Sequence, residues 1–141
     1  MEKNKIYIAS SWKNRHAVEM LTFLLRERYY EVVSFIENEN GEDLSGNFNE
    51  WIKTPDASKS FYHDVKGATE SDFVIYIAPS GKDAIAECGM AYAKDIPLLG
   101  LHAKGEDLGL MRKMFTAWFD NYYDLLDWLR MAKTLKKKGN I

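Results

Sequence analysis

The segment from Ser71 to Gly89, SDFVIYIAPSGKDAIAECG, most constrains the fold of this chain. Phe73–Ala78 is a continuous apolar run with the length and residue types of one buried strand. The polar turn Pro79–Asp83 follows, and helical spacing begins directly after it. A buried strand that leads through a tight turn into a helix is the repeating unit of parallel α/β sheets. Ligands bind in such sheets beside the carboxyl ends of the strands, so this turn marks the expected site.

Glu87 lies in the early turns of the helix that this segment predicts. A helix start offers unpaired backbone N–H groups and the positive end of the helix dipole, both of which favour negative charge. We therefore expect Glu87 to be ionised and to face the crevice. The alternative is an ordinary early-turn glutamate that stabilises the helix by about 0.3–1 kcal/mol and has no chemical role.

Strands and helices alternate along the whole chain. Lys5–Ala9 and Glu31–Ile36 are predicted strands, Arg15–Tyr29 has apolar residues at helical spacing, and Asn14 stands where it can cap that helix. The remaining predicted elements are helices at Ala57–Glu70, Lys82–Lys94 and Tyr122–Lys133, and strands at Pro97–Leu101 and Thr116–Phe119. This alternation predicts a single domain over residues 1–141, an α/β, flavodoxin-like three-layer sandwich with a five-stranded parallel sheet.

Two segments do not follow this alternation. Glu37–Asp56 is long, acidic and rich in turn residues, and long loops inside compact domains are usually functional. Its aromatic residues Phe48 and Trp51 either cover a planar ligand or attach the loop to the core. Leu108–Phe115 is rich in methionine and other apolar residues, which fits either a subunit interface or plain core.

Composition and charge narrow the class of function. With 46% apolar and 28% charged residues, the chain is typical of globular proteins. Its net charge of −2 argues against nucleic acid as a partner, and the basic run Lys136–Lys138 is expected to be a solvated tail. No apolar stretch approaches the ~20 residues that span a bilayer, so we expect no membrane partner. The polar start of the chain, without a signal peptide, favours the cytoplasm.

The single cysteine, Cys88, excludes an internal disulfide and fits a reducing compartment. It directly follows Glu87, so it is interpreted either as a thiol nucleophile or as a small residue that packs the helix on the sheet. The dinucleotide and P-loop glycine motifs, CxxC and HExxH are absent, and His16, His63 and His102 are too scattered to suggest a metal site. We therefore expect no metal and no cofactor, and assign the chemistry to carboxylates and polar turns.

Three stretches resemble one enzyme family in their order and spacing. Lys5–Asn14, KIYIASSWKN, is similar to the first strand and small-residue turn of the nucleoside 2-deoxyribosyltransferases and the related deoxynucleoside monophosphate N-glycosidases. The segment that begins at Glu87, ECGMAYAKDIP, is similar to their E-x-G-x-A-x-A-x-x-x-P segment. Asp64 stands eight residues before Asp72, the offset at which these enzymes place a catalytic-site aspartate. The resemblance covers about residues 5–101.

The resemblance implies cleavage of the N-glycosidic bond of a nucleoside or nucleotide, with transfer of the sugar to another base or to water. It makes Glu87 the nucleophile and Asp64 the group that holds or delivers a proton to the leaving base, unless Asp64 is merely an exposed helix residue. Tyr7 would orient Glu87, or would be only core. Trp12 would stack on the base, or would be a hydrophobic staple. The expected substrate contacts are Ser10, Trp12, Ser80, Gly81, Asp83 and Gly89.

The chain departs from the family pattern at the turn before Glu87. Transferases often carry a further acid six residues before the nucleophile, where this chain has Gly81. Phosphate-preferring relatives use serines in this turn and in a later loop of a neighbouring subunit. This chain has Ser80 there, but also Asp83, whose charge would repel a 5′-phosphate, so we expect a non-phosphorylated substrate.

The resemblance also implies a homodimer or a larger homo-oligomer, because members of the family assemble in this way. The alternative function is a non-catalytic module that binds or senses a nucleotide in the same crevice. Fold alone does not separate the two functions, since flavodoxin-like sheets carry many of them.

Overall fold

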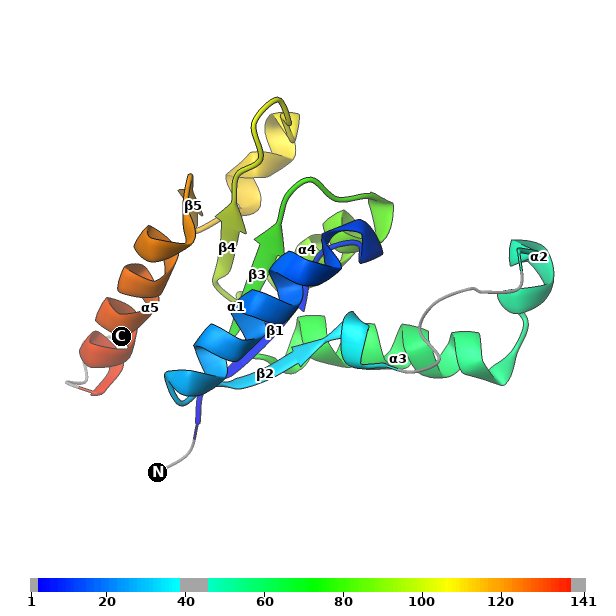
Figure 1. Ribbon diagram of the computed structural model, residues 1–141, viewed down its shortest axis with the longest axis horizontal. Coiled ribbons are helices and arrows are strands. Elements are labelled where there is room, and N and C mark those ends of the chain that lie inside the picture. The colour runs from blue at the N-terminus through cyan, green and yellow to red at the C-terminus, as the bar shows by residue number, and fades with distance from the viewer. Residues whose placement is uncertain (1–2, 39–45, 138–141) are drawn as a thin grey trace.

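The computed structural model describes residues 3–38 and 46–137, with side chains described through Lys133. It is an α/β sandwich around a five-stranded sheet of order β2-β1-β3-β4-β5 (Figure 1). All four strand pairs are parallel. This is the strand order of flavodoxin-like folds, so the predicted fold class is confirmed.

The elements follow one another in the predicted alternation. The strands are β1 (Lys5–Ala9), β2 (Glu31–Ser34), β3 (Phe73–Ile77), β4 (Leu98–Leu101) and β5 (Ala117–Phe119). The α-helices are α1 (Arg15–Glu27), α2 (Phe48–Trp51), α3 (Pro55–Glu70), α4 (Lys82–Ala93) and α5 (Tyr122–Lys137). Three 3-10 helices, η1 (Trp12–Asn14), η2 (Phe35–Glu37) and η3 (Gly109–Met114), connect them.

The two faces of the sheet carry separate cores. Successive side chains of β1 alternate between them: Ile6 and Ile8 pack under α1 and α5, whereas Tyr7 and Ala9 pack under α3 and α4. Because both faces are covered, the strands are apolar without interruption rather than alternating with polar residues. Figure 1 shows the α2 end of α3 extending beyond the edge of the sheet.

Several predicted ends are shifted, each for a local reason. The second strand stops at Ser34 and not at Ile36, because the chain turns into η2 at Phe35. Helix α1 ends before Tyr29, whose φ of 68° is left-handed and does not continue a helix. Helix α3 begins before the predicted Ala57, with Thr54 as its cap and a proline in the first turn. The last helix continues past Lys133 to Lys137.

The two segments outside the alternation are more ordered than their composition suggests. Residues 39–45 of the predicted long loop lie outside the described residues, and the remainder forms η2, α2 and the start of α3. Leu108–Phe115 belongs to the core in part: Met114 and Phe115 pack on it, whereas Leu110 and Met111 are exposed, and the subunit interface stays a prediction. The side chains of Lys136–Lys138 lie outside the described residues.

Within the described parts of the chain, no helix has both the length and the apolar character that crossing a membrane requires.

Candidate active site

A cleft of about 470 Å³ opens at the carboxyl ends of β1, β2 and β3. The predicted substrate and catalytic residues at the cleft are Ser10, Trp12, Asp64, Ser80, Gly81, Asp83 and Glu87. Five other described residues line it that the sequence analysis did not predict as site residues: Ser11, Phe35, Asn38, Lys82 and Ala84. Lys82 directly precedes Asp83, which was predicted to contact the substrate. This neighbouring position was the only feature of the sequence that pointed to Lys82.

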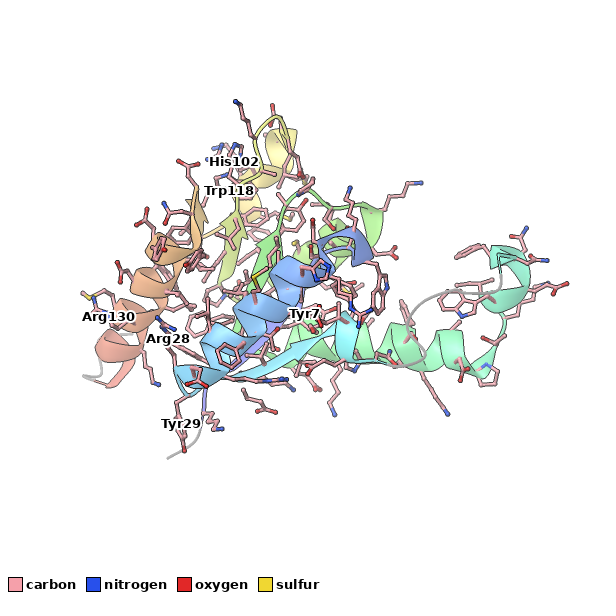
Figure 2. All side chains as sticks on the ribbon, viewed as in Figure 1. Tyr7, Arg28, Tyr29, His102, Trp118 and Arg130 are labelled. Carbon is pink, nitrogen blue, oxygen red and sulfur yellow. The ribbon has the colours of Figure 1, made fainter. Side chains whose placement is uncertain are left out.

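Glu87 is held by Tyr7 at the base of this cleft. The Tyr7 hydroxyl donates to Glu87 Oε1 at 2.7 Å, and the two side chains are 0% and 8% exposed. Tyr7 stands on the face of β1 that is covered by α3, where Gly67 leaves room for its ring (Figure 2). A Cβ at Gly67 would overlap the Tyr7 ring, so the glycine is needed for this close approach. Tyr7 is therefore both a core residue and the hydrogen-bond partner of Glu87.

Asp64 reaches the same cleft from α3, which packs beside α4. Its Oδ1 atom is buried and accepts no hydrogen bond from any described residue. A buried carboxylate oxygen without a protein donor is costly in a folded protein, and a water, an ion or a substrate can supply the contact. The interpretation of Asp64 as an exposed helix residue is therefore wrong.

The pKa of Glu87 is raised to about 8, chiefly by burial and also by the negative charges of Asp64 and Asp83, while the hydrogen bond from Tyr7 lowers it. Burial likewise raises the pKa of Asp64 to about 6, with a smaller contribution from Asp83 and opposing contributions from His63 and Tyr7. The expectation of an ionised Glu87 in the ligand-free site is therefore wrong at neutral pH. The helix dipole acts mainly within the first turn, and Glu87 lies beyond it, among other acids.

The two carboxyl groups share one cleft and have different pKa values. Between pH values of about 6 and 8, the pKa order leaves one proton on the pair, held in the ligand-free site by Glu87. Two titratable groups with separated pKa values in one cleft are the arrangement that general acid–base chemistry uses.

Cys88 is fully buried in the core beneath α4. Burial raises the pKa of its thiol to about 12, with a further contribution from Glu87. A thiol in this environment stays protonated, so its role as a packing residue is confirmed and its role as a nucleophile is wrong. Gly89, the other predicted site residue of this segment, does not line the cleft, and a Cβ there would meet open space.

Trp12 borders the cleft and also packs on the core. Its ring contacts Phe35 edge-on, with 5.2 Å between the ring centroids, and it lies against the core beneath α1. The ring is therefore fixed by Phe35 and presents part of its surface to the cleft, and its stacking on a base stays a prediction.

A second hollow of about 250 Å³ reaches the same carboxylates from the side of α2, α3 and α4. Phe48 and Trp51 line it, together with Asp64, Asp83 and Glu87. The two aromatic residues contact each other, and Phe48 remains 59% exposed. They are therefore placed beside the site and not within the main core.

Among the described residues, no three or more His, Cys, Asp or Glu side chains are placed to hold a metal ion.

Solved structures of other proteins share the fold that carries this cleft. The 2-deoxyribosyltransferase of the psychrotolerant bacterium Bacillus psychrosaccharolyticus superposes with a TM-score of 0.68 and 25% sequence identity, over 86% of this chain and 89% of that one. This chain is nucleoside 2-deoxyribosyltransferase-like.

Two further structures share the fold of this deoxyribosyltransferase-like chain. A conserved protein from Enterococcus faecalis has a TM-score of 0.68 and 18% identity, over 93% of this chain and 99% of that one. The CMP N-glycosidase of Clostridium botulinum has a TM-score of 0.60 and 15% identity, over 90% of this chain and 99% of that one. No protein-family model matches the chain, and no curated protein sequence matches it significantly.

Proposed function

We propose that this chain cleaves the N-glycosidic bond of a (2-deoxy)nucleoside or nucleotide and passes the sugar to another base or to water, with Glu87 as the nucleophile. One observation carries the proposal: the carboxyl groups of Glu87 and Asp64 face one cleft, and Glu87 is held there by a 2.7 Å hydrogen bond from Tyr7. The structural likeness to a 2-deoxyribosyltransferase supports it.

The reaction proceeds by two displacements at the anomeric carbon. The Glu87 carboxylate attacks C1′ on the face opposite the base, the C1′–N bond breaks, and Asp64 gives its proton to the leaving nitrogen. The sugar is then an ester on Glu87. An acceptor base or water attacks C1′ next, Asp64 removes the proton of the acceptor, and Glu87 leaves as a carboxylate.

The proton must move within the pair for this chemistry, because the ligand-free site holds it on Glu87. Positive charge that develops at C1′ favours the ionised form of Glu87, and the Tyr7 hydroxyl donates to the same carboxylate. Substrate therefore shifts the proton toward Asp64, where it is available to the leaving base.

The charges of the cleft favour a substrate without a 5′-phosphate. Asp64, Asp83 and Glu87 line it, against the single lysine Lys82. Asp83 contributes to the raised pKa of both other acids, so its charge acts on the same space. A phosphate dianion would enter against these charges, whereas a neutral nucleoside would not.

We propose that the chain forms a homo-oligomer through η3. Leu110 and Met111 are 72% and 48% exposed, which is unusual for adjacent large apolar side chains in a small domain. Light scattering after gel filtration measures the mass directly. A dimer or larger assembly that dissociates in Leu110→Lys supports this interface, and a monomeric wild type contradicts it.

Chromatography of base release and base exchange tests the function. The protein is incubated with a panel of deoxynucleosides and their monophosphates, with and without a second base, beside Glu87→Gln. Release or exchange by the wild type alone supports the proposal, and the requirement for a second base separates transferase from hydrolase. Tight binding of an intact nucleotide without turnover would instead establish the sensing module.

A further inference from the structure

The Asn14 side chain connects two loops that border the cleft. Its Nδ2 donates to the carbonyl oxygen of Pro79 at 2.6 Å and to Ser10 Oγ at 2.9 Å, with a longer contact of 3.4 Å to the carbonyl oxygen of Ile77. Ser10 Oγ in turn donates to the Ile77 carbonyl at 2.8 Å. We call Asn14 and Ser10, with the carbonyls of Ile77 and Pro79, the Asn14 bridge.

This arrangement replaces the role that the sequence suggested for Asn14. The residue stands at the cap position of α1, yet its side chain makes no capping hydrogen bond. The amide is half-buried and directed toward β3 instead. A neutral amide is suited to this position, because it provides N–H donors where two backbone carbonyls converge.

The bridge also accounts for the hydrogen bonds of the Ser10 hydroxyl. A serine hydroxyl has one hydrogen to donate, and that of Ser10 is committed to the Ile77 carbonyl, while its oxygen accepts from Asn14. Ser10 lines the cleft, but its donor is already used. Its contribution is to hold Asn14 and the end of β3 in place.

The turn that the bridge holds, which ends in the first residues of α4, forms one wall of the cleft. Ser80, Gly81, Lys82 and Asp83 all line the cleft, and Ser80 Oγ is buried without a hydrogen-bond partner among the described residues. Glu87 is fixed separately, by its hydrogen bond from Tyr7. Displacement of the turn should therefore disturb binding contacts more than the position of the nucleophile.

We propose that Asn14, supported by Ser10, is a positioning residue that fixes the Pro79–Asp83 turn for substrate binding. The proposal rests on the proposed function for its kinetic consequence and on the hydrogen bonds alone for its structural consequence. It separates two roles within one cleft: Asn14 acts on the binding contacts, and Tyr7 acts on the nucleophile.

Two substitutions distinguish a bridging role of the Asn14 side chain from a helix-capping role. Aspartate and serine cap helices about as well as asparagine does, but an ionised aspartate has no donor and serine is too short to replace the Asn14 contact with Pro79. Asn14→Asp and Asn14→Ser should therefore raise KM about tenfold, with kcat within about twofold of the wild type. Tyr7→Phe is the contrast, since it should lower kcat. Unchanged kinetics in both Asn14 variants would overturn the proposal.

Hydrogen exchange provides a readout that does not depend on catalysis. In both Asn14 variants, the backbone amides of Ser80–Asp83 should exchange faster than in the wild type, while those in the first turn of α1 stay unchanged. Unchanged exchange in the turn would overturn the bridge, because it is the result expected if Asn14 only capped α1 and the two substitutes cap equally well. If the wild type turns over no nucleoside, the proposed function fails, and this experiment still decides whether the bridge holds the turn. Far-UV circular dichroism and melting temperatures confirm that each variant is folded.

Discussion

Two tyrosine–glutamate pairs have their tyrosines on the same face of the sheet, on neighbouring strands. Tyr7 of β1 donates to Glu87, and Tyr76 of β3 donates to Glu106, each at 2.7 Å. Both tyrosines are fully buried in the core beneath α3 and α4. Burial raises the pKa of each phenol well above its usual range, and the partner glutamate adds to that effect.

The surroundings of the two pairs differ. Glu87 faces a cleft that it shares with Asp64 and Asp83. Tyr76 instead contacts two aromatic rings, with 5.8 Å between its centroid and that of Phe115 and 6.3 Å to that of Trp118, and its glutamate lies in the loop before η3. We therefore infer that this hydrogen bond serves the proposed chemistry where further carboxylates share the cleft, and that it attaches a loop where aromatic rings surround the tyrosine.

The largest expected difference between the two pairs is in kcat after substitution of the glutamates. Glu87→Gln keeps an acceptor for Tyr7 but removes the nucleophile, so kcat should fall about a thousandfold or more. Glu106→Gln makes the same chemical change in the other pair, and its kcat should stay within about threefold of the wild type. Steady-state base release measures both, and equal losses in the two variants would remove the distinction.

The second prediction concerns Asp64, the acid that Tyr76–Glu106 lacks. With pKa values of about 6 and about 8, the pair loses its nucleophile at low pH, when both groups are protonated, and its acid at high pH, when both are ionised. Wild-type kcat/KM should therefore be bell-shaped between these values. Asp64→Asn should lower activity about a hundredfold and leave one rising limb, which lies below pH 8 because the Asp64 charge no longer raises the pKa of Glu87. An unchanged bell would contradict the assignment.

The third prediction concerns stability. The pKa of Glu87 is higher in the folded protein than its usual value, so folding favours the protonated form and the protein loses stability as pH rises toward 8. Glutamine stays neutral at every pH. Glu87→Gln should therefore be more stable than the wild type by about 4 kcal/mol near pH 8 and by much less near pH 4. Urea unfolding at both pH values measures the difference, and a pH-independent difference would show that ionisation of Glu87 is not its cause.

The smallest expected effect comes from substitution of the two tyrosines. Tyr7→Phe removes the hydrogen bond that lowers the pKa of Glu87, so that pKa should rise further and kcat should fall about tenfold. Tyr76→Phe should cost about 1 kcal/mol of stability and leave kcat nearly unchanged. Thermal melts and rate measurements on both variants compare the pairs directly. A larger kcat loss in Tyr76→Phe would reverse the roles.

The fold and the central residues of the cleft could be predicted from the sequence. Apolar runs such as Phe73–Ile77 identify buried strands, and their alternation with helices leaves few possible topologies. Glu87, Asp64 and Tyr7 were found because their offsets from strands resemble a known family. The structure brings these three together.

Three features of the site depend on contacts between distant segments and left no local signal. Asn14 before a helix fits a cap as well as a bridge, and only the fold places the Pro79 carbonyl beside it. In the sequence, Gly67 is only a residue of low helix propensity. The structure shows that it makes room for the Tyr7 ring. The protonation of Glu87 follows from burial beside Asp64, which approaches from another helix and outweighs the local dipole.

The most direct test of the central claim is to identify the bond to Glu87. A reactive deoxynucleoside is mixed with the protein without an acceptor base, the mixture is quenched in acid within the first turnover, and peptides are mapped by mass spectrometry. We expect a sugar attached to the peptide that contains Glu87, present in the wild type and in Glu106→Gln and absent in Glu87→Gln. Base release with the sugar on another residue, or undiminished release by Glu87→Gln, would contradict Glu87 as the nucleophile.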